Sequence, residues 1–419
     1  MKKFIPLAIF AVALLVTVFA CATAGPSPQQ LEEQERARQE AKEARSDSLE
    51  QEVRIAWSLG MEYYKNTQYA DAIRYFKQMV EELDPMDNRG WRYLADSYFR
   101  MGEHDSAFAV YAEGIQRFPE IAFLHRGLAM LYQRKAAEGQ PELLDSAIAS
   151  YIIAYELDNT DAYSPTQIGM VLLSRGMLDS SLVWFTRSVE ADPNQTDTWL
   201  KMADLYLVRG NWEGVREAYR NLARIDPTNT EYALNLGRAQ ANTGDYEDAV
   251  ATLEAYIVSN PEDYRGYQYM GLVHAAKERY DLAQRSFIDA EKLAPTNVRL
   301  LLDIADTYIQ MKRFDQATQY LNKARQQDRN SCQAIVVEGD ICVGRARAAV
   351  PEEGVGVREK LRFECCYEIY SRAVNRGDCD RWGDVARMKM RYLDQFLPTA
   401  QEKTEFFFIH PDLEGKICD

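Results

Sequence analysis

The stretch TDTWLKMADLYLVRGNWEGVREAYRNLARIDPTN, residues 196–229, contains two apolar stripes separated by a turn signal. The first stripe recurs at intervals of three and four residues, as one face of a helix does: Trp199, Met202, Ala203 and Tyr206. The second stripe has the same kind of spacing: Val215, Tyr219 and Leu222. Gly210 lies between the stripes and Pro227 follows the second, so the stretch predicts a helix, a short turn, a second helix and a closing turn.

The same two-helix unit recurs along most of the chain. A small residue marks the first helix of each copy: Gly60, Ala95, Ala129, Gly169, Ala203, Gly237, Gly271, Ala305 and Gly339. Successive members of this series are 35, 34, 40, 34, 34, 34, 34 and 34 residues apart. Small residues let two helix backbones pack closely, and a hairpin of this size cannot bury its apolar face alone. The period therefore predicts an all-α array of stacked helical hairpins.

The residues that recur within the copies resemble the motif of the tetratricopeptide repeat (TPR) family. The second copy matches that motif with Trp91, Leu94, Ala95, Tyr98, Ala107, Tyr111 and Pro119. The first copy matches it with Leu59, Gly60, Tyr63, Ala72 and Phe76. The resemblance covers about residues 53–329, with a degraded copy to about residue 378. It implies a right-handed TPR solenoid of about eight to nine helix-turn-helix repeats.

The sequence divides into four parts: a lipoprotein-type signal peptide (1–20), a charged tether (21–50), the TPR array (51–330) and a Cys-rich segment (331–419). The tether is dense in Glu, Arg and Gln, which predicts a solvated helix or a flexible spacer. Repeat three has six extra residues, which we place in the turn between its helices.

The Cys-rich segment departs from the repeat pattern. It contains a degenerate ninth repeat interrupted at 345–360 and a lone capping helix at 382–396. The apolar run at 406–409 has strand-like preference, and we expect it to pack on the cap, with docking of a partner as the alternative.

The N-terminus has the features of an export signal. Lys2 and Lys3 precede an apolar run that is too short to span a membrane, and the run ends at Cys21. The residues before Cys21 are similar to a bacterial lipobox, which implies lipidation of Cys21, attachment to the membrane through that lipid only, and a place on the periplasmic side of the outer membrane. The alternative is ordinary cleavage after Ala24, which gives a soluble periplasmic protein.

The overall charge argues against two classes of partner. The chain has 419 residues, a formal net charge of −15 and an isoelectric point of about 5.0. Nucleic acids and anionic lipid surfaces attract basic proteins, so neither is expected to bind this chain by charge. The oligomeric state does not follow from the sequence.

The cysteines support the prediction of export. Six of the seven lie in the last part of the chain and are candidates for disulfides: Cys332, Cys342, Cys365, Cys366, Cys379 and Cys418. Cys332 opens the ninth first helix and Cys379 follows its partner helix, so both fall at one end of the pair and are the first pairing we expect. Cys342 lies nearer the other end, with either Cys365 or Cys366. Because no CxxC pair occurs, we expect no metal site.

No enzyme motif occurs in the sequence. HExxH, GxSxG and phosphate-loop patterns are absent, and the acidic residues are spread at helix-surface spacing. Of the four histidines, His125 and His274 occupy first-helix positions where a role in the core or the groove suffices. We therefore expect neither a catalytic site nor a cofactor.

The resemblance implies instead that the first helices line a groove that binds protein or peptide segments. The groove positions of the N-terminal repeats combine aromatic residues, Met and Arg, which are enriched at binding sites: Arg54, Trp57, Met61, Tyr64, Arg89, Arg92, Asp96, Phe99, Arg126 and Met130. The alternative is that the aromatic residues only pack between adjacent first helices. These positions lack the Lys and Asn set of the carboxylate-clamp TPRs, so we do not expect this groove to bind chaperone tails.

These observations together predict an exported, lipid-anchored TPR scaffold. It would bind protein partners in the cell envelope, in outer-membrane assembly, pilus assembly or secretion. The alternative function is binding of glycan or peptidoglycan through the aromatic groove.

Overall fold

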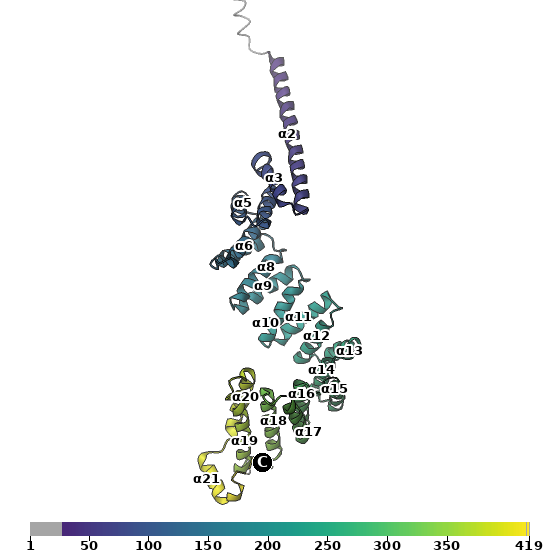
Figure 1. Cartoon of the computed structure of the whole chain (residues 1–419), viewed down its shortest axis with the longest axis vertical. Coiled ribbons are helices and arrows are strands. Elements are labelled where there is room, and N and C mark those ends of the chain that lie inside the picture. Colours follow the sequence, from purple (N-terminus) through teal and green to yellow (C-terminus); the bar gives the residue numbers. More distant parts are fainter. Residues whose placement is uncertain (1–26, 416, 419) are drawn as a thin grey trace, which may run out of the picture. The chain divides into compact units, whose positions relative to one another are not determined.

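In the part of the chain that the structure describes, residues 27–415 and 417–418, every regular element is a helix. The structure is a computed structural model (Figure 1). It confirms the predicted all-α class. The predicted signal peptide and Cys21 lie outside the described residues. None of the described helices is both long enough and apolar enough to cross a bilayer.

The chain divides after Asp192 into two compact units. The helices of the first unit are α2 (Pro28–Lys65), α3 (Tyr69–Gln78), the π-helical turn η1 (Met79–Leu83), α4 (Asn88–Arg100), α5 (His104–Arg117), α6 (Ala122–Ala137), α7 (Leu143–Leu157), α8 (Tyr163–Ser174) and α9 (Leu178–Ala191). They form the first four repeats, each a helix pair joined by a short turn.

The second unit continues the same alternation. Its regular helices are α10 (Thr196–Val208), α11 (Trp212–Ile225), α12 (Thr230–Thr243), α13 (Tyr246–Ser259), α14 (Tyr264–Ala276), α15 (Tyr280–Leu293), α16 (Val298–Gln310) and α17 (Phe314–Gln327). Longer or irregular elements follow: α18 (Cys332–Ala348), α19 (Val357–Val374), α20 (Asp380–Leu393), the 3₁₀ turn η2 (Asp394–Phe396), α21 (Ala400–Ile409) and the 3₁₀ turn η3 (Pro411–Leu413).

The quoted stretch forms α10 and α11, as its two stripes predict. The stripe residues Trp199, Met202, Ala203, Val215, Tyr219 and Leu222 are buried. The Trp199 indole Nε1 donates to the carbonyl oxygen of Pro193, 3.0 Å away, and Trp91 makes the same bond to Pro85. The first helix of a repeat is thus fixed to the turn that closes the preceding one. His125 occupies the corresponding position in repeat three, with its ring Nε2 2.8 Å from the carbonyl oxygen of Pro119, and is buried.

The turn inside each repeat contains one residue with a left-handed backbone. In most repeats it is a glycine, such as Gly210 with φ of 66°. Glycine has no Cβ and adopts this conformation without the steric cost that other residues incur. Thr67, Glu278 and Lys312 adopt it in repeats one, seven and eight. The 34-residue period therefore extends to the backbone conformation of the turn.

The tether, the insertion in repeat three and the interruption of the ninth repeat have defined conformations. The tether from residue 28 onward is helical, since α2 continues from Pro28 into the first repeat, and its side chains up to residue 52 are exposed where they are described. In repeat three, α6 ends at Ala137 and α7 begins at Leu143, so the extra residues lengthen the turn as predicted. The predicted interruption of the ninth repeat is wrong in extent, because only residues 349–356 leave the helices.

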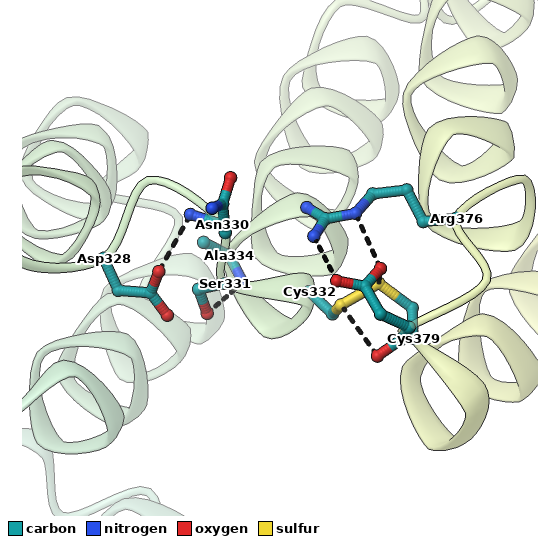
Figure 2. The surroundings of a disulfide bond; sticks show 8 residues. Asp328, Asn330, Ser331, Cys332, Ala334, Arg376 and Cys379 are labelled. Carbon is teal, nitrogen blue, oxygen red and sulfur yellow. Dashed lines mark hydrogen bonds and ion pairs between the residues drawn. A yellow bond between two sulfur atoms is a disulfide. The ribbon is translucent and has the colours of Figure 1, made fainter.

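Three disulfides join the six C-terminal cysteines. The expected bond between Cys332 and Cys379 is present, and it links the start of α18 to the residue before α20 (Figure 2). The other two bonds join Cys342 to Cys366 and Cys365 to Cys418. The adjacent residues Cys365 and Cys366 thus fix α19 both to α18 and to the end of the chain.

The strand-like preference assigned to residues 406–409 is wrong, because these residues form the end of helix α21. Thr399 and Glu402 make a capping box: the Thr399 hydroxyl accepts from the Glu402 backbone amide, and the Glu402 carboxylate accepts from the Thr399 amide. Reciprocal caps of this kind stabilise a helix start. The expected packing holds only in part, since Phe408 is 87% exposed and Ile409 is 68% exposed.

Candidate functional site

The ten predicted groove residues lie on three first helices of the first unit. Arg54, Trp57, Met61 and Tyr64 are on α2; Arg89, Arg92, Asp96 and Phe99 are on α4; Arg126 and Met130 are on α6. Arg54 and Arg89 are exposed, Asp96 is buried, and the others are half-buried. The first helices therefore present a mixed surface of rings, guanidinium groups and methionines, but its members differ in what they contact.

Trp57 contributes mainly to packing. Its ring meets Tyr93 edge to face with centroids 5.3 Å apart and lies 5.9 Å from the ring of Phe76. The guanidinium carbon of Arg89 lies 4.8 Å from the Trp57 ring centroid. Arg89 is held in turn by Asp87, whose Oδ2 is 2.6 Å from its Nη2. Trp57 is thus covered by other side chains, which favours the packing alternative for this residue.

Tyr64 and Asp96 form a closed hydrogen-bond network. The Tyr64 hydroxyl donates to Asp96 Oδ2, and Arg100 Nε donates to the same oxygen at 2.9 Å. Burial, together with the hydrogen bond to Asp96, raises the pKa of Tyr64 above its ordinary value. The network joins α2 to α4, so these residues hold the surface in place.

Arg92 differs from the other arginines of this surface. Its guanidinium carbon lies 3.8 Å from the ring centroid of Phe123 and 5.2 Å from that of Tyr93. Its Nε is buried and has no hydrogen-bond partner among the described residues. The neighbouring Arg126 also lies near Phe123, at 5.2 Å, but it is paired with Asp161 at 3.0 Å. Arg92 is therefore held by aromatic rings and retains an unused donor.

The remaining predicted residues have smaller roles. Met61 and Phe99 pack against the apolar core of the N-terminal repeats, and Met130 packs against the core shared by repeats three and four. Arg54 is exposed and pairs along α2 with Glu50, 3.7 Å away. A loose pair within one helix is easily rearranged, so Arg54 remains open to other partners.

Tyr93 and Asp161 are central to this surface and were not predicted. Tyr93 contacts Trp57 and Arg92, and Asp161 forms an ion pair with Arg126. The sequence feature that could have identified Tyr93 is its position next to Arg92 on a first helix that carries the apolar stripe. Asp161 lies in the turn before α8, outside the first-helix positions that the repeat pattern selects, so the period alone does not identify it.

The cysteine-rich end brings together three potential metal ligands among the described residues: Cys332, Asp378 and Cys379. Two of them are the sulfurs of one disulfide, and a metal binds thiolates rather than disulfide sulfurs. Asp378 is engaged by Arg376, whose Nε and Nη2 lie 3.0 and 2.7 Å from its carboxylate oxygens. The trio is therefore a structural staple with an ion pair beside it.

Comparison with known proteins agrees with the repeat geometry. Two family models described as tetratricopeptide repeat match the chain, one over residues 274–335 and the other over 58–122 and 200–264. The chain is similar to the BBSome complex member BBS4 of Bos taurus, with 24% identity over 257 residues that make up 61% of this chain and 47% of that protein. It is also similar to the TPR repeat-containing protein YpiA of Bacillus subtilis (strain 168), with 24% identity over 243 residues, 57% of this chain and 55% of that protein.

The chain spans about half the length of the curated relatives it matches. A crystal structure of a tetratricopeptide repeat protein from Parabacteroides merdae aligns with 63% of this chain and 98% of its own, with a TM-score of 0.47 and 17% identity. The matched segments lie in both units and carry the helix pairs described above. The chain belongs to the tetratricopeptide repeat family.

Proposed function

We propose that this chain is an exported scaffold that binds a segment of a partner protein in the cell envelope. The binding surface would be the first helices of its N-terminal repeats, α2, α4 and α6. TPR repeats indicate a protein–protein interaction scaffold, and members of the family typically act without catalysis. The relatives include proteins that are parts of complexes by name, such as the BBSome complex member BBS4.

The observation that carries this proposal is the guanidinium group of Arg92, which makes no hydrogen bond or ion pair with any described residue. This group is half-buried against Phe123 and Tyr93 and has lost part of its hydration. An arginine in this state gains most from an acceptor that a partner supplies, such as a carboxylate or a backbone carbonyl oxygen. Aromatic support also fixes its direction, which lowers the entropy lost on binding.

The location in the envelope rests on the two ends of the chain. The lipobox-like residues before Cys21 favour a lipid anchor at the outer membrane, and the three C-terminal disulfides suit an oxidising compartment. We propose attachment through this lipid and a role in assembly, pilus or secretion machinery. Mass spectrometry of the mature N-terminus separates lipidation of Cys21 from cleavage after Ala24.

The glycan alternative is less well supported. Sugars are recognised by open aromatic faces, whereas the Trp57 ring is flanked by Phe76 and Tyr93 and lies under the Arg89 guanidinium. No observation on this surface favours a sugar over a peptide.

The proposal is tested with the variant Arg92→Ala and the control Arg117→Ala. Arg117 also lies over a ring, 5.0 Å from the centroid of Trp91, but it is on the second helix α5 and is paired with Glu113. Immobilised protein is incubated with envelope extract, the retained proteins are identified, and their affinities for the variants are measured. We expect Arg92→Ala to weaken binding about tenfold or more, as for a central arginine of an interface, with Arg117→Ala unchanged.

Two outcomes would contradict the proposal. Retention of polysaccharide without any protein favours the glycan alternative. Equal affinities of the two variants would show that the surface around Arg92 takes no part in binding.

A further inference from the structure

A second candidate site lies at the end of the second unit, far along the chain from Arg92. A cavity of about 730 Å³ opens among the first helices α16 and α18 and the capping helix α20, and Tyr370 of α19 also lines it. Its lining combines carboxylates, bases and rings, and none of the residues predicted for the N-terminal groove takes part in it. We call it the Asp306 pocket.

Two carboxylates of the pocket occupy the same position in consecutive repeats, 34 residues apart, and they differ in their partners. Asp340 Oδ1 accepts from the Tyr370 hydroxyl at 2.6 Å and from the ammonium group of Lys389. Asp306 has no hydrogen bond or ion pair with any described residue. One carboxylate is thus neutralised within the protein, and the other faces the pocket without a counter-ion.

The surroundings of Asp306 disfavour the ionised form of its carboxyl group. Burial away from water, followed by the charges of Asp340 and Asp303, raises the pKa of Asp306 to about 7, against an ordinary value of 3.8. Asp303 accepts from Gln268 Nε2 at 2.6 Å, and burial raises its pKa as well. Three carboxylates, those of Asp303, Asp306 and Asp340, therefore lie near one half-buried ammonium group, that of Lys389, so the interior of the pocket is short of positive charge.

The charged and titratable groups that face Asp306 come from every element around it: Asp303 on α16, Lys312 in the following turn, Asp340 and Arg347 on α18, Tyr370 on α19, and Lys389 and Tyr392 on α20. Lys312 and Arg347 are exposed. The Arg347 guanidinium lies over the Tyr392 ring, 5.1 Å from its centroid. These two cations stand at the rim in water, where they compensate a buried carboxylate only weakly.

The walls of the pocket suit an aliphatic chain that ends in a positive charge. Phe314 is half-buried in one wall, and Tyr392 and Met388 remain 48% and 64% exposed on α20. Rings and a thioether pack well against methylene groups and attract a nearby cation. Lysine and arginine have this composition, with an apolar stem and a charged end.

We propose that the Asp306 pocket binds a lysine or arginine side chain of a partner segment, with the Asp306 carboxylate as its counter-ion and Phe314 and Tyr392 as walls. The inference rests on the proposed function in that it needs a protein partner, but it concerns another unit of the chain and another chemistry. Arg92 offers a donor for an acceptor of the partner, whereas Asp306 offers an acceptor for a cation.

The test uses fluorescent nonapeptides of Gly and Ser with one central Lys, Arg or Gln, blocked at both ends, and the oxidised full chain. We expect the Lys or Arg peptide to bind at least tenfold more tightly than the Gln peptide at pH 8. Because the cation binds the ionised carboxyl group, affinity is expected to fall about tenfold per pH unit below 7, where Asp306 becomes protonated. Asp306→Asn is expected to abolish both the preference and the pH dependence.

The thermal stability of Asp306→Asn serves as a control that this variant folds. The folded-state pKa of Asp306 lies above its ordinary value, so ionisation of this group lowers stability as pH rises from 3.8 through 7. Asp306→Asn removes that loss, and its melting temperature at pH 8 is expected to rise. Asp303→Asn is expected to keep binding and to shift its pH midpoint downward, because it removes one neighbouring negative charge.

Two results would overturn the inference. One is equal affinity for the three peptides, and the other is no binding of the Lys and Arg peptides at millimolar concentration. Neither result touches the Arg92 test, which measures another surface with another partner group.

Discussion

The regular repeats at 196–327 and the segment at 332–413 use the same helical hairpin but hold it together differently. In the regular repeats the helices have 13 or 14 residues, and no cysteine occurs between residues 22 and 331. In the C-terminal segment α18 and α19 have 17 and 18 residues and their loop is longer. One disulfide joins these two helices, and two more join them to later parts of the chain. A regular repeat is stabilised by contact with a repeat on each side, whereas the pair α18 and α19 packs against the single helix α20 on one side.

The comparison shows where covalent bonds are needed in a stacked array. The apolar core at the C-terminal end consists of residues from α18, α19 and α20, among them Val336, Phe363, Tyr370 and Leu393. The disulfides add to the stability of this core by restricting the unfolded chain.

The largest effect is expected from removing the bond between Cys332 and Cys379. The bond closes a loop with a sequence separation of 47 residues. For a loop of this length, chain entropy accounts for about 4 kcal/mol of stability. In the variant Cys332→Ser/Cys379→Ser we expect hydrogen exchange to accelerate in α18, α19 and α20 and to remain unchanged in α12 to α15.

The control is Cys365→Ser/Cys418→Ser, which frees only the end of the chain from α19. We expect it to leave exchange in α18 and α20 close to that of the native protein. An acceleration that spreads over all repeats of the second unit would show that the array is more cooperative than nearest-neighbour contact implies.

A smaller effect is expected from adding one methyl group at the same position of two repeats. A Cβ on Gly339 would lie 2.3 Å from the Tyr370 ring, and one on Gly271 would lie 2.7 Å from the Phe287 ring. Tyr370 is fixed at its far end by the hydrogen bond to Asp340, whereas Phe287 can tilt. Overpacking costs about 1–3 kcal/mol, and alanine regains up to about 1 kcal/mol of helix propensity relative to glycine.

Gly339→Ala is therefore expected to destabilise the protein measurably, and Gly271→Ala much less, in denaturant unfolding followed by circular dichroism. Ala305 occupies the same position in the intermediate repeat and shares a core with Leu321, so alanine is compatible with the fold where leucine replaces the aromatic ring of the second helix. Equal losses for the two variants would mean that the anchor of Tyr370 adds no rigidity.

Most of the fold could be predicted because the same pattern of apolar and small residues recurs in each repeat. The apolar stripes in residues 196–229 predict both helices of one repeat, and the 34-residue period predicts the same helices in the other repeats. The pairing of Cys366 rather than Cys365 with Cys342 was left open, although Phe363, Cys366, Tyr370 and Ala373 form one buried stripe at intervals of three and four. Helix α21 was missed because the apolar residues outweighed the capping pair Thr399 and Glu402, a signal that is short and local.

The candidate sites could be predicted only in part. The period selects the first-helix positions, and it identified Arg92 as one of ten. Which arginine lacks an acceptor depends on partners outside the pattern, such as Asp161 for Arg126. The Asp306 pocket needs α20, which belongs to no repeat and brings Lys389 beside Asp340. The positions of Asp306 and Asp340 follow the 34-residue period, but the period does not predict that only Asp340 has hydrogen-bond partners.

The smallest effect concerns helix α21, which is attached to α19 at the end of the C-terminal segment. Lys360 of α19 pairs with Glu402 at 2.6 Å, and Lys403 pairs with Glu364. The hydrogen bond from Lys360 holds the pKa of Glu402 at about 2, below its ordinary value of 4.5. The ionised Glu402 therefore stabilises the attachment of α21 fully above pH 4.5, and this stabilisation is lost as the pH falls through about 2. The regular repeats have a similar pair, Lys277 with Glu247, but their helices are also held by buried apolar residues.

Glu402→Gln removes the charge but keeps an acceptor for the Thr399 amide, because glutamine also forms capping boxes. We expect α21 to detach more often, so chymotrypsin should cleave the native oxidised variant several-fold faster at residues 406–408 near pH 7. The control is Glu405→Gln, because among the described residues Glu405 bonds only Gln401, which lies on the same helix. In the native protein the same cleavage region should become accessible to pepsin as pH falls from 4 to 2, relative to a free peptide of residues 398–412. If Glu402→Gln and Glu405→Gln are cleaved at equal rates, the ion pair does not hold α21, and the apolar contacts of Phe406 and Phe407 must do so.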